Sequence, residues 1–302
     1  MDSRLASLLR WYRSHQRDLP WRKTRDGYQI FMSELMLQQT QVDRVIPLYK
    51  NWLKKFPSWS ALAEASTPQL LHAWAGLGYN RRALYAREAA RQVVAQGEPK
   101  TEEAWRSLKG VGPYMAAALS EFVNHRRAVV IDTNVRRVAG RAFVGLAYPS
   151  LTDDKRIIRT LERVTPTSGS HWDVPQAFMD LASSTCHARV PDCANCPLQK
   201  VCKARSKFSE KRLEDTLKTK PRKKTTERVH GEKRNPDRIY RGRILAVVRK
   251  EERVSLKTVG PRIDETFDPI ADTDWLHAMV QRLAKDGLII LRAGDTLCLP
   301  HS

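Results

Sequence analysis

Apolar residues recur at helical intervals through residues 1–205 of the chain. Leu5, Leu8 and Tyr12, for example, follow the i, i+3, i+7 spacing of an amphipathic helix over residues 3–15. Period-two alternation, which would predict strands, is almost absent before residue 205. We therefore expect this region to be all α-helical. Further helices are predicted over residues 28–49, 52–55, 58–64, 68–74, 81–96, 101–108, 113–119, 134–143, 153–164 and 174–184.

The pattern changes after residue 205. Residues 206–237 are rich in Lys, Arg, Glu, Thr and Pro, which is typical of a flexible or partly helical linker. Such a linker either adds affinity for phosphates or only keeps the chain soluble. In residues 238–302 the run 244–248 fits a helix or a strand, 275–283 is an amphipathic helix, and a β-hairpin turns at 293–295. This order predicts a small α+β, winged-helix-like domain, a kind that binds DNA in some proteins and protein in others.

The amino-acid composition indicates which class of molecule the protein binds. The 302 residues include 53 Lys and Arg against 33 Asp and Glu, a net charge of +20, and the surplus is spread along the chain. A surplus of this size indicates a polyanion, and its spread favours nucleic acid over a membrane patch. No apolar run approaches the ~18 residues of a transmembrane helix, and none at the N-terminus resembles a signal peptide. We expect a soluble, intracellular protein without membrane contacts.

Four of the five cysteines fall in one segment with the spacing C-x6-C-x2-C-x5-C, namely Cys186, Cys193, Cys196 and Cys202. A disulfide framework does not suit a basic intracellular chain of this size. Four thiolates suit zinc or a [4Fe–4S] cluster. Zinc sites usually pair two C-x2-C motifs and this segment has one, so we favour the cluster. Cys298 stands apart and is expected to be a buried strand residue.

Two glycine turns predict contacts with phosphates. Gly110-Val111-Gly112 separates two predicted helices, and Pro113 suits the first position of the second, as in a helix–hairpin–helix. The backbone N–H groups of such a turn can cradle a phosphate. Gly76-Leu77-Gly78-Tyr79 is a second turn, followed by Arg81, Arg82 and Arg87. These arginines either contact phosphates or form a solvated basic face.

Two carboxylates are candidates for chemistry. Asp132 follows an apolar run and precedes a helix, so it either caps that helix or, with the hairpin, lies close to a bound sugar–phosphate chain. Glu34 lies on the predicted helix 28–49, where it shares a face with Leu37, Gln38 and Gln41 and borders an apolar surface. Its alternative explanation is an ordinary carboxylate at the edge of a helix.

Residues 1 to about 205 resemble the helix–hairpin–helix DNA glycosylases with a terminal iron–sulfur loop, and within them the MutY-type adenine DNA glycosylases. Besides the four cysteines, the matching stretches are Leu19-Pro20-Trp21-Arg22, Ser33-Glu34-Leu35-Met36-Leu37-Gln38-Gln39-Thr40-Gln41-Val42, Val45-Ile46-Pro47, Trp74-Ala75-Gly76-Leu77-Gly78-Tyr79, Leu108-Lys109-Gly110-Val111-Gly112-Pro113-Tyr114 and Ile131-Asp132-Thr133-Asn134-Val135-Arg136-Arg137-Val138.

The resemblance implies a mainly α, two-lobed fold with a six-helix lobe over about 21–125 and an iron–sulfur lobe of 1–20 plus 126–205. It implies a general acid at Glu34 and an oxocarbenium-stabilising or nucleophilic carboxylate at Asp132, which Tyr114 and Asn134 would hold. Gln38 and Gln39 would face the opposite strand and the partner base. The pocket for the flipped base would be lined by Trp21, Arg22, Leu37, Val42 and Gln176. DNA would be held at Gly78, Arg81, Lys109, Gly110, Val111 and Gly112.

The implied reaction is the excision of adenine mispaired with 8-oxoguanine or guanine by a monomeric, cytoplasmic, nucleoid-associated enzyme of base excision repair. Hydrolysis of an N-glycosidic bond needs one protonated and one ionised carboxyl group, as the pair offers. Tyr114 stands where the endonuclease III branch has its Schiff-base lysine, so we expect no strong strand cleavage. Mismatched or oxidised duplex DNA is the expected partner.

The sequence departs from the family pattern at three places, and these departures leave other functions possible. Asn80 replaces the last tyrosine of Gly-Leu-Gly-Tyr-Tyr, Val174-Pro175 replaces Phe-Asn before Gln176, and the larger C-terminal domain related to nucleotide-pool hydrolases is missing. Recognition of 8-oxoguanine is therefore open. The alternatives are a thymine or uracil glycosylase acting on T:G or U:G, disfavoured by Gln38-Gln39, and a non-catalytic DNA-binding protein, disfavoured by the intact carboxylates.

Overall fold

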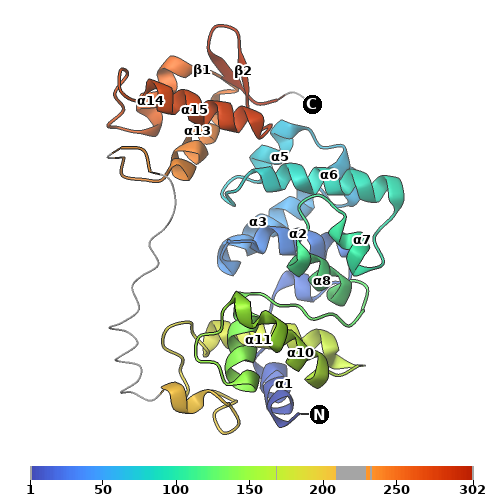
Figure 1. Ribbon diagram of the computed structural model, residues 1–302. Helices are drawn as coiled ribbons and strands as arrows, with labels where there is room; N and C mark the ends of the chain where they lie inside the picture. Colours follow the sequence, from blue (N-terminus) through green and yellow to red (C-terminus); the bar gives the residue numbers. More distant parts are fainter. Residues whose placement is uncertain (1, 168, 209–228, 232, 301–302) are drawn as a thin grey trace. The chain divides into compact units, whose positions relative to one another are not determined.

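The structure is a computed structural model, which describes residues 2–167, 169–208, 229–231 and 233–300 (Figure 1). Two compact units divide the chain. The first unit comprises Met1–Phe31, Pro99–Ser107 and Val111–Lys223, and the second comprises Met32–Glu98, Leu108–Gly110 and Lys224–Ser302. None of the helices in the described ranges is long and apolar enough to cross a membrane.

The first unit is built around an apolar centre that joins the N-terminal helix to later helices. Helix α1 (Ser3–His15) begins after Asp2, whose side chain accepts the N–H of Arg4 and so caps the helix. Its buried face packs on α11 (Asp173–Ser184), which packs in turn on α9 (Thr133–Ala139). The described part of this unit also contains the α-helices α7 (Glu102–Arg106), α8 (Pro113–Phe122) and α10 (Asp154–Val164), and α2 (Gly27–Leu37) begins in it.

The second unit begins with four helices after the end of α2. They are α3 (Val42–Lys55), α4 (Trp59–Ala63), α5 (Thr67–Ala73) and α6 (Arg81–Gln96). Helix α4 packs on α6, and α3 on α5. Trp52 and Trp74 meet edge to face at 5.3 Å between ring centroids. Ser66 and Gln69 form a reciprocal capping box that fixes the start of α5.

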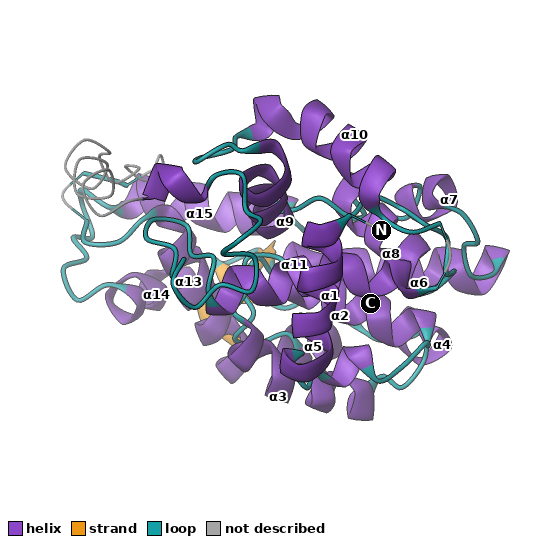
Figure 2. Cartoon of the chain, turned by 90° about the horizontal axis from the view of Figure 1, so that it is seen from below, coloured by secondary structure: helices purple, strands orange, loops and turns teal. Residues whose placement is uncertain are grey.

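The C-terminal part of the second unit is a helical cluster with a small sheet. Its elements are α13 (Asp237–Glu251), β1 (Arg253–Ser255), α14 (Leu256–Ile263), α15 (Thr273–Lys285), β2 (Ile290–Arg292) and β3 (Thr296–Cys298). The strands are antiparallel in the order β1-β3-β2, and Leu297 pairs with both Val254 and Leu291. Figure 2 shows these strands beside α13. Cys298 is buried in β3, as predicted.

The C-terminal helices share one apolar core with α5. Leu71 of α5 belongs to the same buried cluster as Ile244, Val280 and Leu297, and Leu84 of α6 packs against that cluster. A guanidinium N–H of Arg249 donates to the carbonyl oxygen of Leu71 at 3.0 Å. The C-terminal part is therefore fixed to α5 and α6 by burial as well as by a polar contact.

The structure corrects the single helix predicted over residues 28–49. Helix α2 ends at Leu37 and α3 begins at Val42, with Gln39 in the left-handed region at φ 57°. Gln38 and Gln41 therefore do not share a helical face with Glu34. The cause lies far away in sequence, because the Arg82 guanidinium binds carbonyl oxygens at the end of α2.

Smaller differences concern the later elements. The helix predicted over 134–143 is α9 followed by a wider π-turn over Gly140–Val144. The undecided run 244–248 lies in helix α13, and α14 was not predicted because it contains Gly260-Pro261.

Within the predicted linker, residues 209–228 and 232 lie outside the described residues. Near its ends, Phe208 is buried and Lys233 forms ion pairs with Asp264 and Asp272, so packed structure extends into both ends of this range.

Candidate functional site

The predicted hairpin is present between α7 and α8, which pack on each other. Gly110 has φ +83°, a conformation that favours glycine, and an added Cβ there would come within 3.0 Å of the Cβ of Tyr85. Pro113 is the first residue of α8, and Gly112 caps it with extended backbone. A Cβ on Gly112 would meet nothing within 4 Å, so the turn is open to a ligand at this residue.

Asp132 is held at the start of α9 by three hydrogen bonds. Its Oδ1 accepts the backbone N–H groups of Asn134 at 2.8 Å and Val135 at 2.6 Å. Its Oδ2 accepts the side-chain amide of Asn134 at 2.8 Å. Asp132 is thus an N-cap, and the same bonds fix the direction of its carboxylate. The structure brings together Asp132 and Asn134 as expected; Tyr114 is the second residue of α8 and is half-buried.

Arg137 was missed as a member of this group. Its guanidinium donates to Oδ1 of Asn134 at 3.1 Å, and to the carbonyl oxygens of Ala182 at 3.1 Å and Cys186 at 2.8 Å. A chain of hydrogen bonds therefore runs from the Asp132 carboxylate through Asn134 and Arg137 to the backbone of the first cysteine. Burial lowers the pKa of Arg137 from its usual value. The only signal in the sequence was its position three residues after Asn134, on the same face of a helix.

Glu34 lies in the part of α2 that belongs to the second unit. It is 8% exposed and stands between Ser33 and Leu35, both almost fully buried. This burial places the Glu34 side chain inside the protein and not on a solvated face of the helix. Because burying an ionised carboxylate is costly, such a position suits a carboxylic acid that carries a proton. Leu37 and Val42, at the adjoining ends of α2 and α3, are half-buried.

Two residues expected to line a base pocket are held in the first unit by α1 and α11. Gln176 accepts the hydroxyl of Tyr12 at 3.3 Å and donates to the carbonyl oxygen of Trp172 at 3.2 Å. Arg22 binds both carboxylate oxygens of Asp180, at 2.8 and 2.9 Å. The neighbouring Trp21 is buried in the short turn Pro20–Arg22. Asp180, which the structure places against Arg22, was not predicted from the sequence.

Asp180 is a buried anion with two cationic partners. Its side chain is 2% exposed, and Arg17 adds an ion pair at 2.6 Å to that of Arg22. Burial raises the pKa of Asp180, but the hydrogen bond and charge of Arg22, then those of Arg17, outweigh it and hold that pKa below its usual value.

Asp180→Asn should lower the free energy of unfolding by about 3 kcal/mol, because it leaves two partly buried guanidinium groups without their anion. Urea denaturation at neutral pH measures this. The folded-state pKa is depressed, so the contribution is complete above the unfolded value of about 3.9 and lost as pH falls through the folded value. The two proteins should therefore converge in strong acid. Asp18→Asn, which breaks an exposed pair with Lys23, is the control and should change little.

A buried arginine joins the turn between α2 and α3, which carries Gln38 and Gln39, to the second glycine turn. Arg82 donates to the carbonyl oxygens of Leu35 at 2.6 Å and Gln38 at 2.8 Å, and to those of Leu77 at 3.0 Å and Gly78 at 3.2 Å. Burial lowers its pKa to about 10, so it stays protonated at neutral pH. Its role is to hold the two turns together, and it is not available to a phosphate.

The other two arginines of this cluster differ from each other. Arg87 donates to the carbonyl oxygen of Ala65 at 3.0 Å and is a structural residue like Arg82. Arg81 has a side chain 51% exposed and forms an ion pair with Asp286 at 3.2 Å. Of the three, Arg81 alone is placed to meet a ligand. The hairpin residue Lys109 is also exposed, and its backbone N–H donates to Gln92 at 3.2 Å.

The four clustered cysteines line one small cavity together with Arg141 and Phe208. Burial raises the pKa of the Cys196 thiol to about 12 and also raises those of Cys193 and Cys202. Arg141 donates to Sγ of Cys186 at 3.3 Å. The donor set fits a bound metal group, whose positive charge would be needed to ionise these thiols.

Comparison with known proteins agrees with this arrangement. The family model "HhH-GPD superfamily base excision DNA repair protein" matches residues 32–166. An adenine DNA glycosylase of Mycolicibacterium smegmatis is 38% identical over 209 residues, which cover 67% of this chain and 69% of that protein. Human adenine DNA glycosylase is 36% identical over 220 residues, 69% of this chain. The chain spans only 40% of the length of the human protein.

Solved structures show the same fold. A thermostable thymine-DNA glycosylase superposes with a TM-score of 0.62 at 28% identity, covering 67% of this chain and 95% of that one. A trapped covalent intermediate of endonuclease III with DNA gives a TM-score of 0.58 at 19% identity, covering 67% and 94%. Sequence, hairpin and fold agree, and the chain belongs to the adenine DNA glycosylase family of the HhH-GPD superfamily.

Proposed function

We propose that this protein is a monofunctional DNA glycosylase of base excision repair that flips out and hydrolyses adenine mispaired with 8-oxoguanine or guanine. The buried carboxyl group of Glu34 carries this proposal, because departure of a purine base requires a general acid and burial disfavours the ionised form of a carboxyl group. Membership of the adenine DNA glycosylase family supports it. The net charge of +20 and the open glycine turn support a DNA partner, with which a relative in fold has been solved.

The reaction divides between two carboxyl groups. Glu34 donates its proton to the adenine ring as the bond from the sugar C1′ to the base nitrogen breaks. Asp132 stabilises the positive sugar or bonds to it transiently, while Asn134 and Tyr114 keep it in position. Water then adds to C1′ and gives up a proton to a carboxylate, which restores the enzyme. Hydrolysis leaves an abasic site and free adenine.

The proposed pocket for the base uses Trp21, Leu37, Val42 and Gln176. Arg22 has a different part from the one that sequence alone suggested. Since both of its terminal nitrogens bind Asp180, it positions the turn that carries Trp21. Gln38 and Gln39 would reach the partner base, and backbone groups at Gly78 and Gly110–Gly112, with Arg81 and Lys109, would hold phosphates.

We infer that Cys186, Cys193, Cys196 and Cys202 hold a [4Fe–4S] cluster. They line a cavity, and their spacing contains one C-x2-C motif, whereas zinc sites usually pair two. This arrangement favours a cluster over zinc. When bound, the cluster would tie the end of α11 to the loop that carries the other three cysteines, without taking part in base release.

Cys196→Ala should therefore remove the visible absorbance and the iron, and should lower the melting temperature by several degrees. Metal analysis and thermal unfolding of purified protein measure both effects. Cys298→Ala, outside the cluster, is the control and should keep its iron. Stoichiometric zinc in the wild type, with no iron or sulfide, would overturn the cluster assignment.

A duplex panel tests the proposed activity. Base release is measured from A:8-oxoguanine, A:G, T:G and U:G, and release of adenine is the expected result. Preferential release of thymine or uracil would instead support the second candidate, which the likeness to a thymine-DNA glycosylase favours. Tight DNA binding without release of any base would indicate a non-catalytic protein. Because Tyr114 cannot form a Schiff base, borohydride should trap no robust covalent complex.

We further propose that residues 238–302 form a winged-helix-like domain. Their order of helix, strand, two helices and a terminal β-hairpin supports this assignment. The packing of Leu71 and Leu84 against this part indicates that the domain works as a fixed extension of the second unit.

A further inference from the structure

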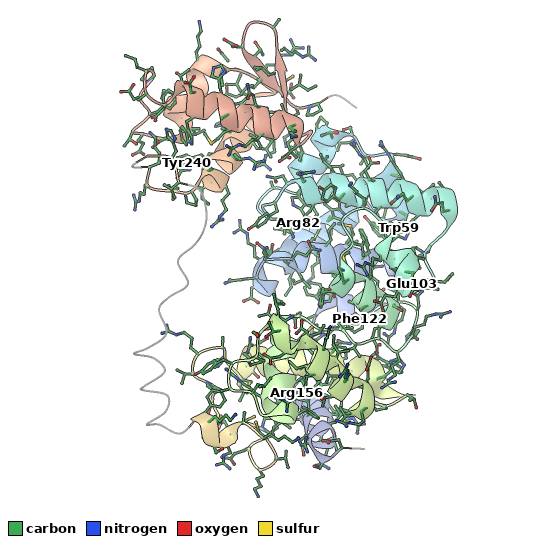
Figure 3. The ribbon with its side chains drawn as sticks, in the orientation of Figure 1. Trp59, Arg82, Glu103, Phe122, Arg156 and Tyr240 are labelled. Carbon is green, nitrogen blue, oxygen red and sulfur yellow. The ribbon has the colours of Figure 1, made fainter. Side chains whose placement is uncertain are left out.

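A pocket of about 630 Å³ lies within the second unit. There the C-terminal helices meet the turn at Gln38 and Gln39 and the turn at Gly78 and Tyr79. One side is formed by Gln38, Tyr79 and Tyr85. The other is formed by Arg238, Arg241 and Gly242 of α13, with the end of α15 beyond. Figure 3 labels Arg82 of α6 and Tyr240 of α13, one in each of the parts that meet here. Glu34 does not line this pocket, so it is separate from the proposed site of base release.

The walls of the pocket are held in fixed positions. Asp286 at the end of α15 forms ion pairs with Arg81 of α6 at 3.2 Å and with Arg241 of α13 at 2.5 Å. Leu84 of α6 packs on the C-terminal core behind these ion pairs. A ligand would therefore meet a preformed surface made by two parts of the chain that are distant in sequence.

The lining is basic and aromatic. Four arginines face one carboxylate, that of Asp286, and two tyrosines complete the wall. Arg82 binds carbonyl oxygens, and Arg81 and Arg241 pair with Asp286, so guanidinium groups from both α6 and α13 line the pocket. Among the residues that the structure describes, none accepts a hydrogen bond from the buried Nε of Arg241. Guanidinium groups beside aromatic rings suit a nucleotide, which offers a phosphate and a flat base.

Gly242 gives independent support for a ligand. It lies inside α13, where glycine is a poor helix former, and its φ is not in the left-handed region. An added Cβ would meet nothing within 4 Å, so no neighbour in the described chain requires a glycine. A glycine at the wall of an open pocket permits close approach of a ligand to the backbone. On the opposite wall, Gln39 and Tyr79 have φ of 57° and 46°, strained values that are common at binding sites.

We propose that this pocket binds a nucleotide of the DNA duplex other than the excised one, with its phosphate on Arg238 and Arg241 and its base beside Tyr79. The proposal rests on the proposed function, because it takes DNA as the partner. It gives the C-terminal domain a direct part in holding the duplex, through the first half of α13.

The test compares two variants of the full-length protein with a charge-matched control. Gly242→Leu places a side chain at the wall of the pocket, at a position where an added Cβ meets nothing within 4 Å, and Arg238→Gln removes a proposed phosphate partner. Arg253→Gln, at an exposed position of strand β1, removes the same charge elsewhere. Each variant should bind a mispaired duplex about tenfold more weakly, while the control stays within about twofold. Arg238→Gln should also reduce the salt dependence of binding by about one ion.

Further measurements separate a loss of DNA binding from a loss of folding or of base release. Gly242→Leu should melt no lower than the wild type, and the rate of base release at saturating protein should stay within about twofold. A duplex series with one neutral methylphosphonate at each linkage then finds the phosphate. One linkage should weaken binding of the wild type and leave Arg238→Gln unaffected, and its position identifies the strand.

Wild-type affinity in Gly242→Leu, or equal sensitivity of wild type and Arg238→Gln at every linkage, would overturn the proposal. A loss of affinity that comes with a lower melting temperature would also overturn it, since the role of Gly242 would then be structural. Failure of the wild type to release adenine would instead overturn the proposed function, because binding is measured independently of base release.

Discussion

Replacement of Glu34 by glutamine should slow base release by about 10²–10⁴-fold. Glutamine keeps the shape of the side chain and suits the buried position, but its amide cannot supply the acidic proton that the leaving adenine needs. The rate is measured in a single turnover with excess protein on an A:8-oxoguanine or A:G duplex. Affinity for the same duplex should change little, because the substitution leaves the DNA-holding turns intact.

The control for this prediction is Glu64→Gln, which alters an exposed carboxylate at the end of α4 in the same unit. Its rate should equal that of the wild type. If Glu34→Gln kept a rate within about tenfold of the wild type, below the range of general acid catalysis, the proton would have to come from another group.

Asp132→Asn should slow base release by on the order of 10²–10³-fold, by analogy with the loss of one preorganised electrostatic group from a transition state. Asparagine caps helices as well as aspartate does, so α9 should stay folded while the negative charge is lost. Circular dichroism and thermal unfolding show whether the helix is preserved. Single-turnover kinetics then measure the effect of the charge alone.

A matched control exists in the same unit. Asp2 caps α1 by accepting the N–H of Arg4, just as Asp132 caps α9, but it belongs to no proposed site. Asp2→Asn should leave base release unchanged. If both substitutions slowed the reaction equally, the effect of Asp132→Asn would come from its capping role, and the carboxylate would have no part in the chemistry.

The sequence predicts well what depends on local pattern. Helices 3–15 and 81–96 were predicted with the bounds that α1 and α6 have. The glycine turn and Pro113 predicted the hairpin, since the reasons for those residues are conformational and local. The spacing of the four cysteines likewise predicted that they would lie together around one cavity.

The features that were not predicted from the sequence depend on charged side chains that bind partners far away in the chain. Arg82 ends α2 by binding its carbonyl oxygens, although 44 to 47 positions separate the partners. Asp180 and Arg22 are 158 positions apart, and Arg137 reaches Cys186 over 49. In the sequence each of these side chains is one charged residue among many, and only the tertiary structure shows which are buried and paired.

The shared core of the C-terminal helices and α5 limits what truncation can reveal. A chain cut after residue 208 would leave the faces of Leu71 and Leu84 in water, and an uncovered apolar surface of this kind promotes aggregation. Low activity in such a shortened protein would therefore report damage to the part of the protein that remains. Point substitutions on α13 are the cleaner way to learn whether the tail contributes to repair.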